Sequence, residues 1–174
     1  PRSLPGMKER SLIVGSMSKS HAMTGSRIGW VIGPEDIIAK LSDLATVSNY
    51  GVVGFIQDAA EYALHLGSSA FISVSAPFKR RRKLALEIFK EFPQINVIPP
   101  QGAMYLMLDI RSTGLNGEAF ANALLEQRKI AVMPGESFGA AAAGHIRVAM
   151  TVEDALFSKA LESLCDFATN LASK

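Results

Sequence analysis

The sequence contains little cysteine, no long apolar run and little charge of one sign in excess. Cys165 is the single cysteine among 174 residues, which excludes an internal disulfide and a cysteine metal cluster and is typical of the reducing cytoplasm. No apolar run approaches the roughly 20 residues of a membrane-spanning helix. With 18 basic and 16 acidic side chains, the net charge is only +2, so the balance predicts no nucleic-acid binding.

The rest of the composition predicts a folded protein with a substantial core. Hydrophobic residues make up 48% of the chain and charged residues 20%, which excludes a disordered chain. His21, His65 and His145 are scattered, so their spacing predicts no metal site. Four consecutive basic residues at 80–83 predict a solvated helix face, because no aromatic side chains are interleaved for stacking on bases.

Periodicity predicts a mixed α/β chain with a boundary near residues 93–100. The predicted helices begin at Pro34, cover 55–66, follow Pro77 as far as Pro93, and cover 117–128 and 152–171. Their apolar stripes are expected on Phe78, Leu84, Ile88 and Phe92, and on Leu156, Ala160, Leu164, Phe167 and Leu171. Strands are expected at 12–14, 28–32, 95–98, 104–110, 130–133 and 146–149, and a loop at 15–27.

The loop at 15–27 is the segment with the most chemistry. Lys19 follows an apolar strand and suits two functions, a point charge for phosphate or a nucleophile that forms an imine. The second function needs a neutral amine, which a neighbouring cation such as Arg27 favours. Ser16, Ser18 and Arg27 suit phosphate oxygens. A solvated surface lysine is the third interpretation, whereas a P-loop is excluded because its glycine positions are occupied by other residues.

Two further segments carry candidate site residues. The run at 135–139 matches the G-x-S-x-G pattern of hydrolases, but no acidic residue lies between Ser137 and His145, so we interpret it as a turn. Arg147 lies on an alternating strand opposite Ile146 and Val148. It therefore points either into solvent or into a cleft, where a guanidinium naturally binds a carboxylate with two hydrogen bonds.

Taken together, these segments resemble the class I/II aminotransferases, which are pyridoxal-phosphate enzymes of fold type I. The resemblance rests on seven runs that follow one another in the family's order: Ser16–Lys19, Thr24–Trp30, Ser48-Asn49, Ile56–Ala60, Pro100–Tyr105, Met133–Gly139 and Ile146–Val148. Residues 18–25 and 143–147 look similar to arginine–pyruvate transaminases. The resemblance implies an α/β fold in which 1–92 are the tail of the large cofactor domain and 93–174 the complete α+β small domain.

The resemblance also implies a role for each candidate residue. Lys19 would form the Schiff base with pyridoxal 5'-phosphate and then carry the proton. Ser16, Ser18 and Arg27 would bind the cofactor phosphate, Arg147 would bind the substrate α-carboxylate, and Asn49 would approach the site of the neighbouring subunit. The implied substrates are an amino acid and a 2-oxo acid, and the implied assembly is a homodimer.

Members of this family are much longer, so the chain is expected to be a C-terminal piece. By itself it would lack the acidic partner of the pyridine nitrogen and be inactive, and its sequence does not decide whether it retains the cofactor. Two alternatives share the lysine and the arginines. One is a pyridoxal-phosphate lyase or acyl-condensing enzyme of the same fold, and the other is the aminotransferase-like sensor domain of a transcription regulator.

Overall fold

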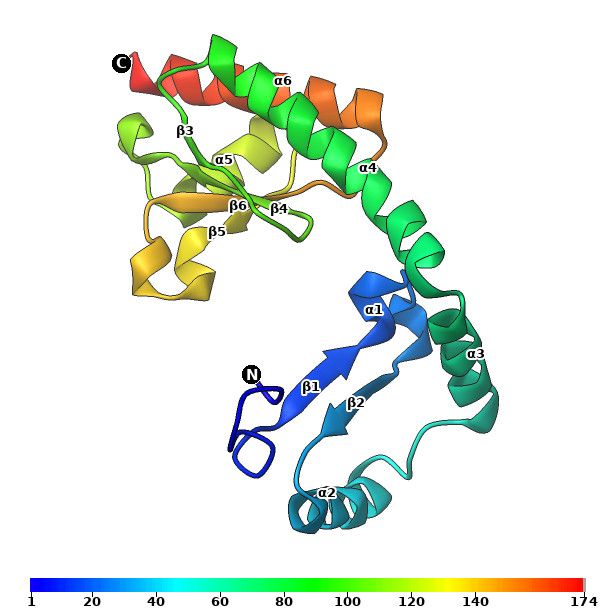
Figure 1. The fold of residues 1–174 in the computed structure, drawn as a ribbon. Helices are drawn as coiled ribbons and strands as arrows, with labels where there is room; N and C mark the ends of the chain where they lie inside the picture. Colours follow the sequence, from blue (N-terminus) through cyan, green and yellow to red (C-terminus); the bar gives the residue numbers. More distant parts are fainter. Residues whose placement is uncertain (174) are drawn as a thin grey trace. The chain divides into compact units, whose positions relative to one another are not determined.

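Two short apolar segments flanking the lysine pair as antiparallel strands in the computed structural model, which describes residues 1–173. β1 (Ile13–Ser16) pairs with β2 (Gly29–Ile32), so that Gly15 lies opposite Trp30 (Figure 1). A Cβ on Gly15 would overlap the Trp30 indole, so the close approach of the Trp30 ring to the backbone of β1 requires glycine at position 15. Between the strands lie α1 (Met17–Ser20) and the 3-10 helix η1 (Thr24–Ser26), where the sequence predicted only a loop.

Two helices follow where the sequence predicted them. Glu35 and Asp36 in the first turn of α2 (Glu35–Ser48) complement the helix dipole, and α3 (Gly54–His65) begins after the expected break. Among the hydrophobic side chains of residues 1–75, only Met17 and Ala60 are buried. The first part of the chain therefore has a small core and many exposed apolar side chains.

The next helix, α4 (Gly67–Ile88), differs from the prediction because it continues through Pro77. Pro77 lacks an amide hydrogen, so the helix gives up one backbone bond there without ending. Its buried residue is Ala85, whereas the expected Leu84 is 37% exposed. The chain forms two compact units that divide inside α4, between Ser75 and Ala76, ahead of the 92/93 position expected for the domains. Lys174, the last residue of the expected second domain, lies outside the described residues.

The second unit contains a four-stranded antiparallel sheet in the order β3-β4-β6-β5. Its strands are β3 (Asn96–Ile98), β4 (Tyr105–Asp109), β5 (Met133–Pro134) and β6 (His145–Ala149). The sequence predicted a strand at 130–133, but β5 has only two residues, because Pro134 cannot donate to a ladder and the chain turns there. An edge strand accommodates this proline. Short 3-10 helices are η2 (Phe89–Glu91), η3 (Arg111–Thr113), η4 (Gly135–Phe138) and η5 (Ala140–Ala142).

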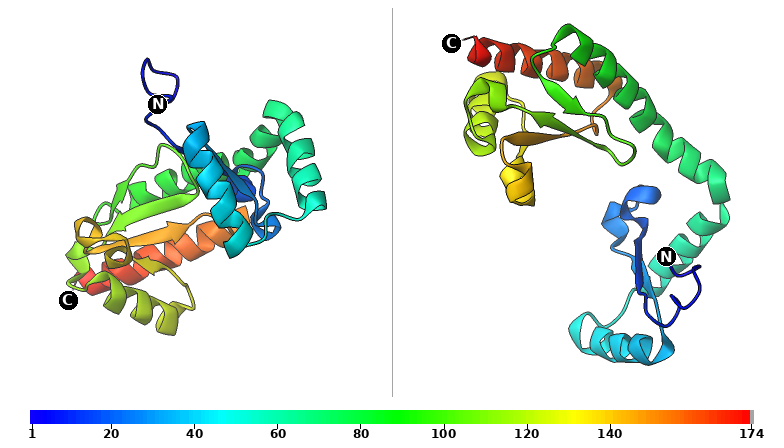
Figure 2. Two further views of the ribbon diagram at one scale, coloured as in Figure 1. Left: turned by 90° about the horizontal axis from the view of Figure 1, so that it is seen from below. Right: turned by 60° about the vertical axis from the view of Figure 1, so that its left-hand side comes forward.

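One face of this sheet packs into the core, and the other carries Arg147. Alternation along β4 and β6 buries Leu106, Leu108, Ile146 and Val148. Helices α4, α5 (Gly117–Arg128) and α6 (Asp154–Ala172) supply most of the other core side chains, and the part of α4 that belongs to the second unit runs beside α6 (Figures 1 and 2). In α6 the predicted Leu164 and Phe167 are buried, but the first turn differs from the prediction: the expected Leu156 is 52% exposed, and its neighbour Phe157 is buried instead.

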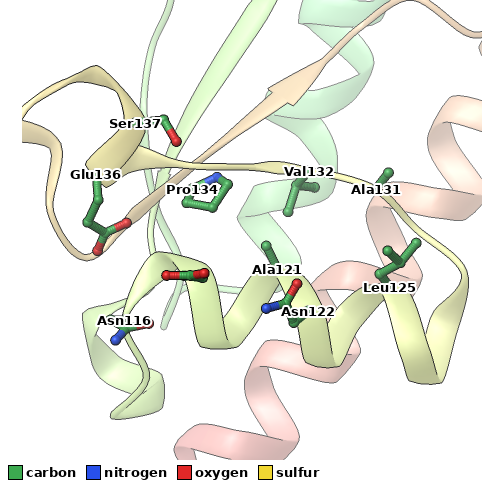
Figure 3. Close-up of a pocket in the computed structure, with 10 residues that line it drawn as sticks. Asn116, Ala121, Asn122, Leu125, Ala131, Val132, Pro134, Glu136 and Ser137 are labelled. Atoms are coloured by element: carbon green, nitrogen blue, oxygen red, sulfur yellow. The ribbon is translucent and has the colours of Figure 1, made fainter.

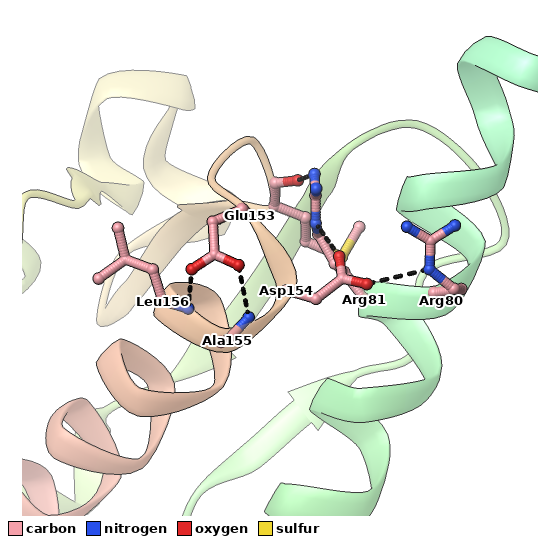
Figure 4. Close-up of polar contacts among 7 residues, drawn as sticks. Arg80, Arg81, Glu153, Asp154, Ala155 and Leu156 are labelled. Carbon is pink, nitrogen blue, oxygen red and sulfur yellow. Dashed lines mark hydrogen bonds and ion pairs between the residues drawn. The ribbon is translucent and has the colours of Figure 1, made fainter.

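In the basic run at 80–83, Arg80, Arg82 and Lys83 are exposed as predicted, whereas Arg81 is not. The Nε atoms of Arg80 and Arg81 lie 2.9 Å and 2.7 Å from the carboxylate oxygens of Asp154 (Figure 4). Arg81, whose side chain is only 12% exposed, also donates to the carbonyl of Met150. Glu153 caps α6 beside this pair by accepting two backbone amides. Arg81 therefore ties α4 to the start of α6. No helix within residues 1–173 combines the length and apolar character needed to cross a bilayer.

Candidate active-site residues

The lysine segment is held by a side-chain cap and by a backbone bond to Ile28, the residue just before β2. Ser16 Oγ accepts a hydrogen bond from the amide of Ser18 at 3.1 Å and so caps α1, which is a single turn of four residues. The buried Met17 anchors the segment, and its amide donates to the carbonyl of Ile28. The sequence folds this way because a serine at the end of a strand can supply the acceptor that a helix start requires.

Lys19 and Arg27 extend from opposite ends of this anchored segment. Lys19 is exposed in α1. Arg27 follows η1 in the left-handed backbone region, with φ of 51°, and its Nη1 donates to the carbonyl of Thr24 at 3.0 Å. The amide of Met23 donates to the carbonyl of Met17, which joins the two short helices. The structure thus brings the four predicted residues Ser16, Ser18, Lys19 and Arg27 onto one compact turn-rich segment.

Asn49 lies later in the first unit, at the C-terminus of α2. Its Oδ1 accepts the amide of Gly51 at 2.9 Å, which forms a tight turn after the helix. Tyr50 next to it is 92% exposed, with φ of 56°. The contacts of Asn49 are those of a turn residue, and its predicted role toward a neighbouring subunit stays a prediction.

Arg147 lies on β6 between two aromatic rings. Its Cζ is 4.2 Å from the ring centroid of Tyr105 and 4.3 Å from that of Phe138, both within cation–π range. Among residues 1–173, no Asp or Glu side chain forms an ion pair with this guanidinium. We call these three side chains the Arg147 stack. It holds the plane of the guanidinium and leaves its hydrogen-bond donors available to a ligand.

Sequence reasoning gave no role to Tyr105 and Phe138. Tyr105 pairs with Ala149, and Arg147 pairs with Met107, so Tyr105 and Arg147 are diagonal neighbours on one face. Alternation places both residues on open faces, but only the register of β4 against β6 brings them together. Phe138 comes from η4, a segment with no periodic pattern, so no sequence signal could have indicated its contact.

The G-x-S-x-G run lies beside a cleft of about 410 Å³ between α5 and the chain at 131–137 (Figure 3). Ser137 and Glu136 line it together with Asn116, Glu118, Ala121, Asn122, Leu125, Ala131, Val132 and Pro134. None of these ten residues is a histidine. A serine nucleophile requires a base within hydrogen-bond reach, so the arrangement agrees with the interpretation of this run as a turn.

Comparisons with known proteins fit this geometry. Residues 3–164 match the family "Aminotransferase class I and II". The arginine–pyruvate transaminase of Pseudomonas aeruginosa is 45% identical over 152 residues, 87% of this chain and 39% of that protein. The aspartate aminotransferase of Pyrococcus abyssi is 38% identical over 84% of this chain and 38% of its own length.

Solved structures agree in fold. The aromatic aminotransferase of Pyrococcus horikoshii superposes with a TM-score of 0.90 and 33% identity over 97% of this chain and 45% of that one. The aspartate aminotransferase of Thermus thermophilus with maleate has a TM-score of 0.83 and 30% identity over 91% and 41%. The chain spans less than half the length of these relatives. The family match over most of the chain, the sequence identities and the shared fold show that the chain belongs to the class I and II aminotransferases, which are pyridoxal-phosphate proteins of fold type I.

Proposed function

We propose that this chain is the C-terminal part of an aminotransferase that moves an amino group from an amino acid to a 2-oxo acid. Both substrates carry an α-carboxylate, for which a bidentate arginine is a natural partner. The observation that carries the proposal is the guanidinium of Arg147, which Tyr105 and Phe138 hold between their rings without an ion pair inside residues 1–173. Donors that are oriented by the fold and lack an internal carboxylate suit such a ligand.

The lysine segment has the donor set that the phosphate of pyridoxal phosphate requires. Ser16 Oγ uses a lone pair on the amide of Ser18, so its own hydroxyl hydrogen is available to a phosphate oxygen. Arg27 uses Nη1 on the carbonyl of Thr24 and retains its other donors. Two hydroxyl groups and a guanidinium suit a phosphate dianion, and the amine of Lys19 extends from the same segment. These residues therefore fit the cofactor.

The residues of the chain divide the chemistry between them. When bound, pyridoxal phosphate supplies an aldehyde that condenses with amines and a ring that accepts electrons from the substrate Cα. Ser16, Ser18 and Arg27 bind its phosphate. The Lys19 amine holds the cofactor in the resting protein and, once neutral, takes up the proton from the substrate Cα. Arg147 binds the α-carboxylate through two hydrogen bonds and so orients the substrate.

The first unit supports the proposal that the chain belongs to a longer protein. Two strands are too few for an independently stable sheet. Val14, Phe55 and Tyr62 are 78%, 71% and 70% exposed, and such apolar surface is typical of faces that other segments cover. In this proposal, residues 1–92 complete the cofactor domain and 93–174 form the small domain. The piece alone is inactive, and Asn49 faces the partner site of a homodimer.

The named relatives favour transamination over the lyase, acyl-condensing and sensor alternatives, because each is named as an aminotransferase. Arginine with pyruvate is the substrate pair that the relative at 45% identity suggests. The buried free thiol of Cys165 suits a reducing compartment such as the cytoplasm.

The experiment that tests the proposal is borohydride reduction of the full-length protein after addition of pyridoxal phosphate, followed by peptide mapping by mass spectrometry. Borohydride makes the reversible lysine–cofactor linkage permanent, so we expect the added mass on the peptide that contains Lys19. Lys8 and Lys40 are exposed lysines of the same unit and serve as internal controls that stay unmodified. An adduct on another lysine, or none, would overturn the proposal.

A further inference from the structure

One carboxylate, that of Glu136, connects three segments of the second unit. Its Oε1 accepts the amide of Gly117, the first residue of α5, at 3.0 Å, and the amide of Gly144, just before β6, also at 3.0 Å. Glu136 itself belongs to η4. Figure 3 shows its side chain extending from η4 toward the start of α5, where Asn116 caps the helix. Amides at a helix start have no intrahelical acceptor, so an anion is favoured there.

Backbone segments approach closely around this carboxylate. A Cβ on Gly135 would lie 2.7 Å from the carbonyl oxygen of His145, and one on Gly117 would lie 2.8 Å from that same oxygen. The amides of Gly144, of Glu136 itself and of Gly117 donate to the carboxylate and hold its pKa below the usual value. The glutamate is therefore ionised and serves backbone groups.

The segment that Glu136 anchors has little else to hold it. Between Glu136 and Ala143, no residue is buried, and the backbone bonds inside the segment are local turns. Burial of apolar surface, the usual source of stability, is thus small here. Phe138, whose ring forms one side of the Arg147 stack, belongs to this segment. Its place over Arg147 depends on whatever fixes the turn.

Phe138 and Arg147 contact each other, and each lies close in the chain to Glu136 or to an amide that Glu136 binds. Phe138 follows Glu136 by two residues, and Arg147 follows Gly144 by three. We infer that Glu136 is a positioning residue for the carboxylate site: by binding the amides of Gly117 and Gly144, it holds Phe138 against Arg147 and fixes the direction of the guanidinium. This inference rests on the proposed function for the meaning of the site, but the contact it describes can be measured without cofactor or substrate.

The experiment observes the Arg147 side chain by NMR in the ¹⁵N-labelled full-length protein, without added cofactor or substrate. The Nε–Hε signal of Arg147 is assigned by its loss in Arg147→Lys. Because aromatic rings face the guanidinium from two sides, we expect this signal upfield of the other arginines. Phe138→Leu should move it downfield, and Glu136→Ala should move it in the same direction. Glu136→Gln should leave it near the wild-type position, because the amide oxygen can still accept both backbone donors.

The matched control is Asn116→Ala. Asn116 Oδ1 accepts the amide of Ala119 at 2.8 Å, so this variant weakens the same helix start without touching the Glu136 contacts. It should lower the melting temperature and leave the Arg147 signal in place. The inference fails if Glu136→Ala leaves the signal unmoved, if Asn116→Ala moves it as far, or if Phe138→Leu has no effect. If Glu136→Ala does not fold, Glu136→Asp, which is one methylene too short to reach both amides, replaces it.

This test is independent of the borohydride experiment. Labelling of Lys19 together with an unmoved Arg147 signal would keep the proposed function and reject the positioning role. A moved signal without labelling of Lys19 would reject the proposed cofactor chemistry and keep the role of Glu136 in orienting Arg147.

Discussion

Replacing Arg147 by lysine keeps the positive charge and removes the geometry on which the carboxylate site depends. A planar guanidinium can lie between Tyr105 and Phe138 and still present two parallel donors, whereas an ammonium group is a point charge without a fork. The variant loses one charge-assisted hydrogen bond and the flat contact with the rings. We take this loss as about 2–3 kcal/mol, which corresponds to a roughly 30- to 150-fold lower kcat/KM for the amino donor.

The assay is steady-state transamination by the full-length protein, with Arg128→Lys as the control. Arg128 is an exposed arginine at the end of α5, so its replacement should leave KM unchanged. The loss in Arg147→Lys should fall mainly on KM, because the carboxylate is bound in the ground state as well as in the transition state. An unchanged KM for both the amino acid and the oxo acid would refute the reasoning about Arg147.

Three further predictions concern the second unit. Phe120 is fully buried and packs edge-to-face on Phe167, so Phe120→Ala should lower the unfolding free energy by about 3–5 kcal/mol, whereas the half-exposed Leu125→Ala should lower it far less; urea titration measures both. The hydrogen bond from the Arg111 guanidinium lowers the pKa of Asp109 to about 2, so the ionised Asp109 stabilises the fold fully above pH 4 and loses this contribution as the pH falls toward 2. In an acid titration, the unfolding free energy of Asp109→Asn should therefore decline less over this range than that of the wild type. Burial raises the pKa of Cys165 to about 12, so a thiol reagent at pH 8 should label it only in denaturant, and rapid native labelling would contradict the structure.

Several elements could be predicted because their signals are local. The helix at 117–128 has the predicted bounds, since Asn116 caps it and Lys129 ends it in the left-handed conformation. Strands around Ile13 and Ile146 follow from short runs of β-branched residues. Proline misled the prediction at Pro77, because one missing amide hydrogen weakens a helix without always ending it. It misled the prediction again at Pro134, where the strand is shorter and lies later in the chain than its apolar run.

The sequence by itself determined the family, the lysine segment and the candidates Ser16, Ser18, Lys19, Arg27 and Arg147, because side-chain chemistry and order along the chain can be read directly. It could not determine which helix positions face the core, because a stripe of apolar residues allows neighbouring rotations, and the sheet decides among them, as the exposed Leu156 and buried Phe157 illustrate. Only the tertiary structure joined Tyr105 and Phe138 to Arg147, tied Arg81 to Asp154 and turned Glu136 toward two distant amides. Those contacts depend on strand register and on turns without periodicity, which bring together residues far apart in the chain.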